Sequence, residues 1–161
     1  DAGKGANDII YWNNTAPTDT QFSVGTYAGV NGAGNNYIAY LWTSVPGYSA
    51  FGTFTGNGNA DGPFVYLGFR PAFVLVKRTE AAGGWFIQDS SRDPYNPSDK
   101  DLRSELADAE QTGSLYYIDF LSNGFKLRTS FSQMNGSGGT YVYAAFAENP
   151  FTETGVPPTA R

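Results

Sequence analysis

The 161-residue sequence contains no cysteine and no histidine. Without cysteine there is no disulfide and no thiol nucleophile. Without histidine there is no imidazole base, so a Ser-His-Asp triad and a histidine-ligated zinc or iron site are both excluded. Only 10 residues are Lys or Arg, against 15 Asp and Glu, and no basic run occurs. Because binding to a phosphate backbone depends on basic clusters, the composition argues against a nucleic-acid partner.

Charge and long apolar runs are also scarce. Charged residues make up 16% of the chain, below the usual ~25%, and no apolar run is long enough to predict membrane insertion. Aromatic residues reach 16%, with 20 Gly and 9 Pro. This composition is typical of short strands joined by tight turns.

The hydrophobic patterning predicts short strands almost throughout, each rich in aromatic or β-branched residues and bounded by Gly, Pro or Asn. Their spacing of about 8–12 residues predicts an all-β fold, an antiparallel β-sandwich of the jelly-roll or lectin-like kind. Helix-forming residues gather only near 101–109, where we expect at most one short helix. The expected strands are Asp8–Trp12, Gln21–Tyr27, Tyr37–Thr43, Ser49–Thr55, Phe64–Phe69, Ala72–Thr79, Trp85–Asp89, Leu115–Leu121, Phe125–Ser130 and Thr140–Ala147.

Some of these strands can be assigned a buried face. Apolar and polar side chains alternate along residues 125–130. This places Phe125 and Leu127 inward, and Lys126 and Arg128 outward. Residues 73–76 are apolar on both faces, as expected of a strand in the middle of a sandwich. The sequence Ser122-Asn123-Gly124 predicts a hairpin with a type I′ turn, because Asn-Gly accepts positive φ angles.

An internal repeat is present. Phe22–Trp42 aligns with Phe125–Phe146 once one residue is inserted, and both copies consist of a strand, an Asn-Gly-x-Gly turn and an aromatic strand. The copies are 103 residues apart before the insertion and 104 after it, which indicates a repeat unit of about that length. Alternatively, two hairpins of one sandwich merely look alike.

The repeat leads to a domain assignment. Residues 1–50 resemble the second half of the unit that is complete at 51–150, so we expect a chain derived from a longer modular protein. Residues 1–151 are expected to form a single β-sandwich domain. Residues 152–161, which contain Pro157-Pro158, are expected to be an extended tail.

Carboxylates are the only groups left for acid–base chemistry, and they gather between residues 89 and 119. Two of them across a sugar site would suit a glycanase, with Asp89 and Asp119 as candidates. No spacing specifies such a pair, however. The simpler interpretation is an acidic loop in which Asp89 or Asp93 pairs with Arg92 or Arg78.

One segment resembles the start of a calcium loop. Asn57, Asn59 and Asp61 place oxygen ligands at alternate positions and are followed by a glycine, but the position of the usual bidentate Glu is occupied by Gly68. The segment is therefore a weak calcium candidate, and a Gly-rich turn between two strands is the favoured interpretation. No other cofactor is expected.

The aromatic residues exceed what a core of this size requires, so some are expected at the surface, stacking on sugars or filling a subunit interface. Trp12 and Trp85 lie at the edges of predicted turns, and Tyr95 lies in a Pro-rich loop beside Arg92 and Asp93. These five residues are the candidate ligand-binding set. Core packing is the alternative for each aromatic.

Several motifs in order carry a resemblance to a known family. They are Gly68–Thr79 (GFRPAFVLVKRT), Trp85–Arg92 (WFIQDSSR), Ile118–Phe125 (IDFLSNGF) and Asn135–Glu148 (NGSGGTYVYAAFAE). Together they resemble repeat modules found near the C-termini of tailed-bacteriophage virion proteins, notably tail fibre and tail spike proteins. The likeness covers 51–151 well and 8–46 as a partial copy.

The resemblance implies a virion module without a catalytic residue set, often a β-sandwich displayed as a homotrimer. It places the protein in the phage tail, and outside cells after release. The hypothesis from the sequence is a non-enzymatic receptor-binding module that attaches to a host-surface glycan or receptor. The alternatives are a purely structural module that trimerises or spaces a fibre and, less favoured, the carboxylate-dependent glycanase.

Overall fold

The computed structural model describes residues 8–113 and 115–150. These residues form two compact units, 8–42 and 43–150, and each unit is described by itself below. The predicted tail at 152–161 lies outside the described residues. None of the described helices has the length and apolar character needed to cross a membrane.

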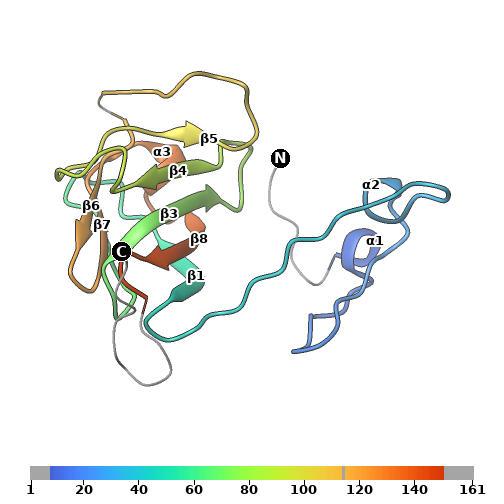
Figure 1. The fold of residues 1–161 in the computed structure, drawn as a ribbon. Helices are drawn as coiled ribbons and strands as arrows, with labels where there is room; N and C mark the ends of the chain where they lie inside the picture. The colour runs from blue at the N-terminus through green and yellow to red at the C-terminus, as the bar shows by residue number, and fades with distance from the viewer. Residues whose placement is uncertain (1–7, 114, 151–161) are drawn as a thin grey trace. The chain divides into compact units, whose positions relative to one another are not determined.

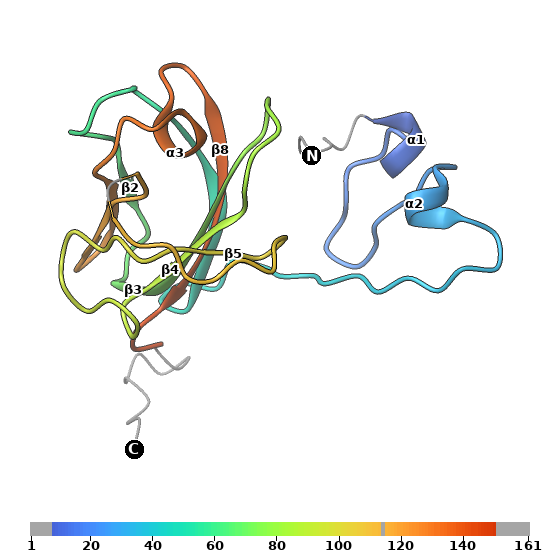
Figure 2. The ribbon, with the colours of Figure 1, turned by 90° about the horizontal axis from the view of Figure 1, so that it is seen from above.

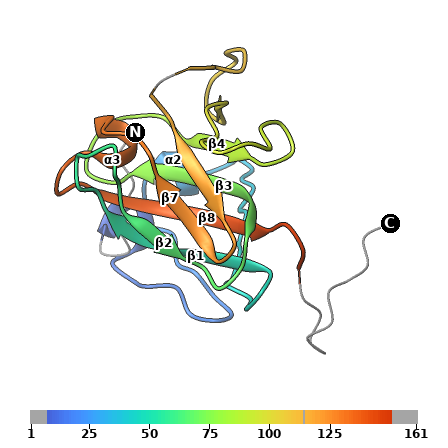
Figure 3. The ribbon, with the colours of Figure 1, turned by 90° about the vertical axis from the view of Figure 1, so that its left-hand side faces the viewer.

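Residues 43–150 form two antiparallel sheets, which confirms the prediction of an all-β sandwich. In Figure 3 the three-stranded sheet lies in front of the larger one and its strands run obliquely across it. The five-stranded sheet has the order β1 (Ser49–Thr55), β8 (Thr140–Ala147), β3 (Pro71–Arg78), β4 (Phe86–Asp89) and β5 (Leu102–Arg103). The three-stranded sheet has the order β2 (Phe64–Tyr66), β7 (Gly124–Leu127) and β6 (Ile118–Leu121).

The local predictions for this unit are largely confirmed. β1 and β8 have the predicted bounds, and β3 lies inside the larger sheet between β8 and β4. Phe125 and Leu127 are fully buried, whereas Lys126 points outward to Asp61, 2.9 Å away. Because side chains alternate along a strand, this single register buries the apolar face of β7 and places Lys126 on the opposite face.

The β6–β7 hairpin forms where predicted, with Leu121 opposite Gly124. Its turn is not type I′, because neither of the two central residues, Ser122 and Asn123, has a positive φ. The glycine is required for another reason. A Cβ at position 124 would lie 2.1 Å from the carbonyl oxygen of Val65 on the neighbouring strand.

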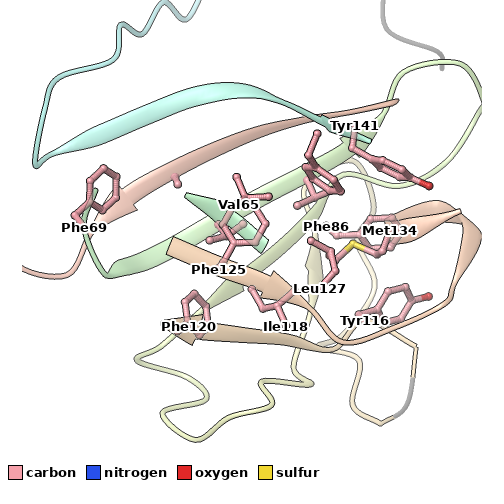
Figure 4. Packing of buried hydrophobic residues seen from close by; sticks show 14 residues of the cluster. Val65, Phe69, Phe86, Tyr116, Ile118, Phe120, Phe125, Leu127, Met134 and Tyr141 are labelled. Carbon is pink, nitrogen blue, oxygen red and sulfur yellow. The ribbon is translucent and has the colours of Figure 1, made fainter. Parts of the chain in front are cut away.

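The core lies between the two sheets and is rich in aromatic rings (Figure 4). Phe54 of β1 stacks on Tyr141 of β8 with ring centroids 5.0 Å apart and meets Phe125 of the opposite sheet edge-on at 6.1 Å. Burying a large apolar side chain contributes about 1.5–3 kcal/mol. These contacts across the sheets therefore account for much of the driving force for folding.

The helix expected near 101–109 is absent. Leu102 and Arg103 instead form β5, the edge strand beside β4, and Asp101 makes a β-bridge with Gln111. The four-residue α3 (Ser132–Asn135), the one helix among the described residues of the sandwich, packs near β8 (Figure 2). The helix propensity of the segment is weak, and pairing with an exposed sheet edge outweighs it.

Residues 8–42 contain no strand, so the three strands expected there are wrong. Residues 9–12 form a short helix, α1 (Ile9–Trp12), and a second, α2 (Ala28–Asn31), follows (Figure 1). Asp8 caps α1 by accepting hydrogen bonds from the amides of Ile10 and Tyr11. A strand gains its backbone hydrogen bonds only from a neighbouring strand, and the described part of this unit offers none.

Candidate binding site

The five sequence-predicted binding residues do not come together. Trp12 belongs to the 8–42 unit, in α1. Trp85 precedes β4, whereas Arg92, Asp93 and Tyr95 follow its other end. Only these last three are neighbours, and they lie in one loop at the end of the sandwich where β3 begins.

Arg92 is committed to the structure of this loop. Its Nε pairs with Asp89, its Nη1 lies 2.7 Å from a carboxylate oxygen of Glu110, and its Nη2 donates to the carbonyl of Ile87 at 3.2 Å. Burial works against the charged form of Asp89, but hydrogen bonds and charge from Arg92 outweigh it, so the pKa of Asp89 is lowered. Of the pairings that the sequence left open, Asp89 with Arg92 is the one observed, and it closes the turn after β4.

The rest of the loop leaves one aromatic ring free to meet a ligand. Asp93 accepts a hydrogen bond from the amide of Asp99 at 2.8 Å. The side chain of Asn96 donates to the carbonyl of Phe120 and accepts from its amide, at 3.0 and 2.9 Å. Tyr95, between these anchors, is 81% exposed. Fixed neighbours and a free ring make Tyr95 the best supported of the five predicted residues.

A small hollow of about 240 Å³ opens at the same end of the sandwich. It is lined by Gly68, Phe69, Arg70, Ser122 and Asn149. These residues come from the segment that enters β3, from the β6–β7 turn and from the chain that leaves β8. The lining combines one buried aromatic ring with guanidinium, hydroxyl and amide groups.

Arg70 connects the hollow to the Tyr95 loop. Its Nη1 donates to the carbonyl of Phe120 at 2.7 Å, the same carbonyl that Asn96 binds, and its Nε lies 2.9 Å from Glu148. Gly68 has φ +80°, and a Cβ there would lie 3.6 Å from the hydroxyl of Tyr66, so the Tyr66 side chain is close to this lining residue. The Tyr66 side chain is 67% exposed, so an accessible aromatic ring stands beside the hollow.

Sequence reasoning missed this site. Tyr66 and Asn149 carry no signal in the sequence, because nothing local shows that they meet. Arg70 and Ser122 do lie within the quoted motifs, but those motifs are far apart along the chain. Only the antiparallel pairing of β3 with β8, and of β6 with β7, brings them together.

The calcium candidate is a loop closed by its own hydrogen bonds. The side-chain oxygen of Asn57 accepts from the amide of Asn59, and that of Asn59 accepts from the amide of Asp61. The carboxylate of Asp61 lies 2.9 Å from Nζ of Lys126. Within residues 8–113 and 115–150, no group of three or more acidic residues is placed to hold a metal. The oxygens that calcium would need already accept other hydrogen bonds.

The two carboxylates considered for glycanase chemistry each face an arginine. Asp89 pairs with Arg92, and Asp119 lies 3.4 Å from Nε of Arg128. A glycosidase acid requires a raised pKa, whereas the pKa of Asp89 is lowered. Their surroundings therefore suit structural ion pairs.

Comparison with known proteins gives a family for this arrangement. Residues 1–150 match the model of a domain of unknown function, DUF7483. The chain belongs to this family. No curated protein and no solved structure matches the chain.

One ionisable group in this DUF7483 domain is buried with a poor partner. The carboxylate of Asp101 is fully buried, and the nearest cation, Nε of Arg103, is 3.7 Å away. The Arg103 guanidinium lies over the rings of Phe86 and Tyr116 and donates to the Tyr116 hydroxyl, which draws it away from Asp101. Burial consequently raises the pKa of Asp101, despite the opposing charge of Arg103.

Replacing Asp101 with asparagine is expected to stabilise the sandwich at pH 7 by about 1–2 kcal/mol, because it removes a buried charge with an incomplete partner. The raised pKa means that the folded state holds the proton of Asp101 more tightly than the unfolded state does. This contribution to the stability of the fold is complete below the unfolded pKa and is lost as the pH rises through the raised folded pKa. The advantage of Asp101→Asn should therefore shrink as the pH falls toward 3.8. Urea unfolding from pH 3 to pH 8 measures this, with Asp99→Asn as the matched control. An equal gain at all pH values would contradict the assignment.

Proposed function

We propose that this domain is a non-enzymatic attachment module of a phage tail fibre or tail spike, and that it binds a host-surface glycan at the hollow beside Tyr66. The observation that carries the proposal is the composition of that end of the sandwich. A guanidinium, a hydroxyl and an amide line one hollow there, and the exposed rings of Tyr66 and Tyr95 lie outside its lining at the same end. The motif resemblance to virion modules supports the same class of function.

This chemistry suits a sugar. A sugar ring offers an apolar C–H face, which packs on an aromatic ring, and hydroxyls that both donate and accept hydrogen bonds. Arg70 supplies donors, while Ser122 and Asn149 supply donors and acceptors. At about 240 Å³ the hollow is smaller than the ~300–1,000 Å³ clefts that enclose drug-sized ligands. It suits one sugar unit of a longer glycan, bound with modest affinity.

The structural alternative, a module that trimerises or spaces a fibre, keeps one specific observation in its favour. In the 8–42 unit, Ile38, Tyr40 and Leu41 are each more than 70% exposed. A contiguous set of exposed apolar side chains is typical of an interface with another protein surface. Sedimentation of the whole chain distinguishes the two functions, since a stable trimer that binds no sugar would favour the structural role.

The glycan proposal predicts the effect of Tyr66→Ala. Removing a ring that packs on the sugar face should weaken binding about tenfold, at the upper end of what an aromatic contact contributes. The measurement is titration of the whole chain against a panel of immobilised mono- and oligosaccharides. Tyr40→Ala, which removes a ring of similar exposure (72%) from the other unit, is the matched control. Equal weakening by both variants, or no binding at millimolar sugar, would rule the site out.

A further inference from the structure

The repeat in the sequence is also a repeat in local structure. α2 and α3 each contain four residues and each follows an aromatic residue with extended backbone, Tyr27 (φ −66°, ψ 128°) and Phe131 (φ −64°, ψ 126°). Each ends at a glycine with nearly the same angles, Gly32 (φ −74°, ψ 135°) and Gly136 (φ −65°, ψ 143°). The two segments therefore share one backbone conformation, 104 residues apart.

A tyrosine fixes each helix in the same way. The hydroxyl of Tyr37 accepts a hydrogen bond from the amide of Gly32 at 2.7 Å and donates to the carbonyl of the first residue of α2. The hydroxyl of Tyr141 accepts from the amide of Gly136 at 2.6 Å and donates to the first carbonyl of α3. The two tyrosines have equivalent structural roles.

Asn31 and Asn135 occupy equivalent positions in the two segments but differ in their hydrogen-bond partners. Asn31 donates to the carbonyl of Gly25 at 2.9 Å, as Asn135 does to Thr129 at 2.8 Å. Asn135 also makes three hydrogen bonds with the 57–59 loop, which follows β1, and it is fully buried. Asn31 is exposed, and the described residues provide it with no such loop. The missing contacts all come from the first half of the module.

Among the described residues, the segment that follows this motif lacks backbone partners at residues 37–41. With the 104-residue shift, residues 36–43 correspond to β8, the strand that lies between β1 and β3. Tyr141 and Ala145 of β8 are fully buried, whereas their equivalents Tyr37 and Leu41 are 46% and 72% exposed. The backbone of residues 37–41 makes no hydrogen bond to another backbone group of the described chain. Both of its edges are open.

An apolar groove accompanies these open edges. It has a volume of about 550 Å³ and lies entirely within the 8–42 unit. Its lining includes Phe22, Val24, Val30, Tyr37 and Tyr40. A groove of this kind is expected where the neighbouring strands that would cover the apolar side chains of a sandwich are absent.

We propose that residues 8–42 are the receiving half of a sandwich, completed by strands equivalent to β1 and β3 from another repeat unit; a second copy of this chain does not supply them, because its own β1 and β3 already pair with its β8. These strands add to the two edges of residues 37–41, a β-strand addition in which backbone hydrogen bonds supply affinity and side-chain pockets supply register. In the sandwich of this chain Val76 lies opposite Tyr143, the equivalent of Ala39. A loop equivalent to 57–59 then covers Asn31. This inference does not depend on glycan binding.

The test adds a synthetic peptide with the sequence of Gly68–Thr79, which contains β3, to the whole chain. Hydrogen–deuterium exchange at the amides of residues 37–43 is the measurement. We expect saturable protection there, with exchange slowed by at least about tenfold, since paired strand amides exchange only on local opening. A scrambled peptide should give no protection.

Two proline variants serve as the test variant and its matched control in this exchange experiment. Ala39→Pro removes an amide from the open strand and should abolish the protection. Ala33→Pro lies in the turn after Gly32, whose extended ψ of 135° tolerates a following proline, so protection should persist. Circular dichroism confirms that both variants keep the 43–150 sandwich.

Three outcomes would overturn the proposal. One is unchanged exchange at 37–43 with millimolar peptide. Another is protection confined to 43–150, which means that the peptide replaces β3 there. The third is protection of 37–43 in the free chain that rises with protein concentration, which assigns the groove to a second copy of this chain.

Discussion

Replacing Asn135 with alanine is expected to destabilise the sandwich by about 3–4 kcal/mol, because several buried groups would lose their partner and each costs roughly 1–3 kcal/mol. The Asn135 side chain is fully buried and joins three parts of the chain. Its amide nitrogen donates to Asn57, Asn59 and Thr129 at 2.8–3.0 Å, and its oxygen accepts from the amide of Asn57 at 2.8 Å.

The equivalent residue of the other unit is the control. Asn31→Ala removes one hydrogen bond at an exposed position, so we expect a loss below about 1 kcal/mol. Urea unfolding followed by circular dichroism compares the two variants. Equal losses would show that burial beneath the 57–59 loop is not the source of the effect, and would also weaken the equivalence on which the groove proposal rests.

Arg92→Ala has the second largest expected effect, a loss of about 2–3 kcal/mol, since charge-assisted hydrogen bonds to partly buried partners are about twice as strong as neutral ones. The Arg92 side chain is 25% exposed and contacts Asp89, Glu110 and the carbonyl of Ile87. Arg128→Ala is the matched control. Its side chain is 42% exposed and its ion pairs are 3.4 and 3.6 Å long, so its loss should stay below about 1 kcal/mol.

The Arg92 effect should depend on pH in a defined direction. Because the folded-state pKa of Asp89 is lowered from 3.8, the pair stabilises the fold fully above that unfolded value. The contribution is lost as the pH falls through the lower folded pKa. The difference in unfolding free energy between wild type and Arg92→Ala should therefore narrow below pH 3.8. A difference that stays constant down to pH 2 would show that the arginine acts by packing alone.

Most charged residues of the quoted motifs have structural partners. Lys77 is fully buried, and its Nζ donates to the carbonyls of Arg78 and Ala81 at 2.6 and 3.2 Å. Burial lowers the pKa of this ammonium group. Arg70 and the Asp89–Arg92 pair hold neighbouring turns. The charged residues of these motifs therefore stabilise the fold. The exposed rings at the end of the sandwich are the part available to contact a ligand.

The sequence by itself determined the elements whose pattern is local and whose partners lie in the same unit. β1 and β8 have their predicted bounds, the alternation of β7 places Phe125 and Leu127 in the core, and the β6–β7 hairpin forms where Asn-Gly predicts it. The sequence also indicated an ion pair in the acidic loop, although only the structure selected Asp89 and Arg92 from the pairings left open.

Only the tertiary structure decided the remainder. The 101–109 segment forms β5 instead of a helix because an open edge of β4 is available to it. Residues 37–41, with a strand-like sequence, form no strand because the described chain offers their backbone no neighbouring strand. The hollow beside Tyr66 joins segments that are remote along the chain. Strand pairing and surface sites depend on residues that are far apart along the chain. The side-chain pattern therefore indicates which residues suit a sheet, but a neighbouring strand must be available before the sheet forms.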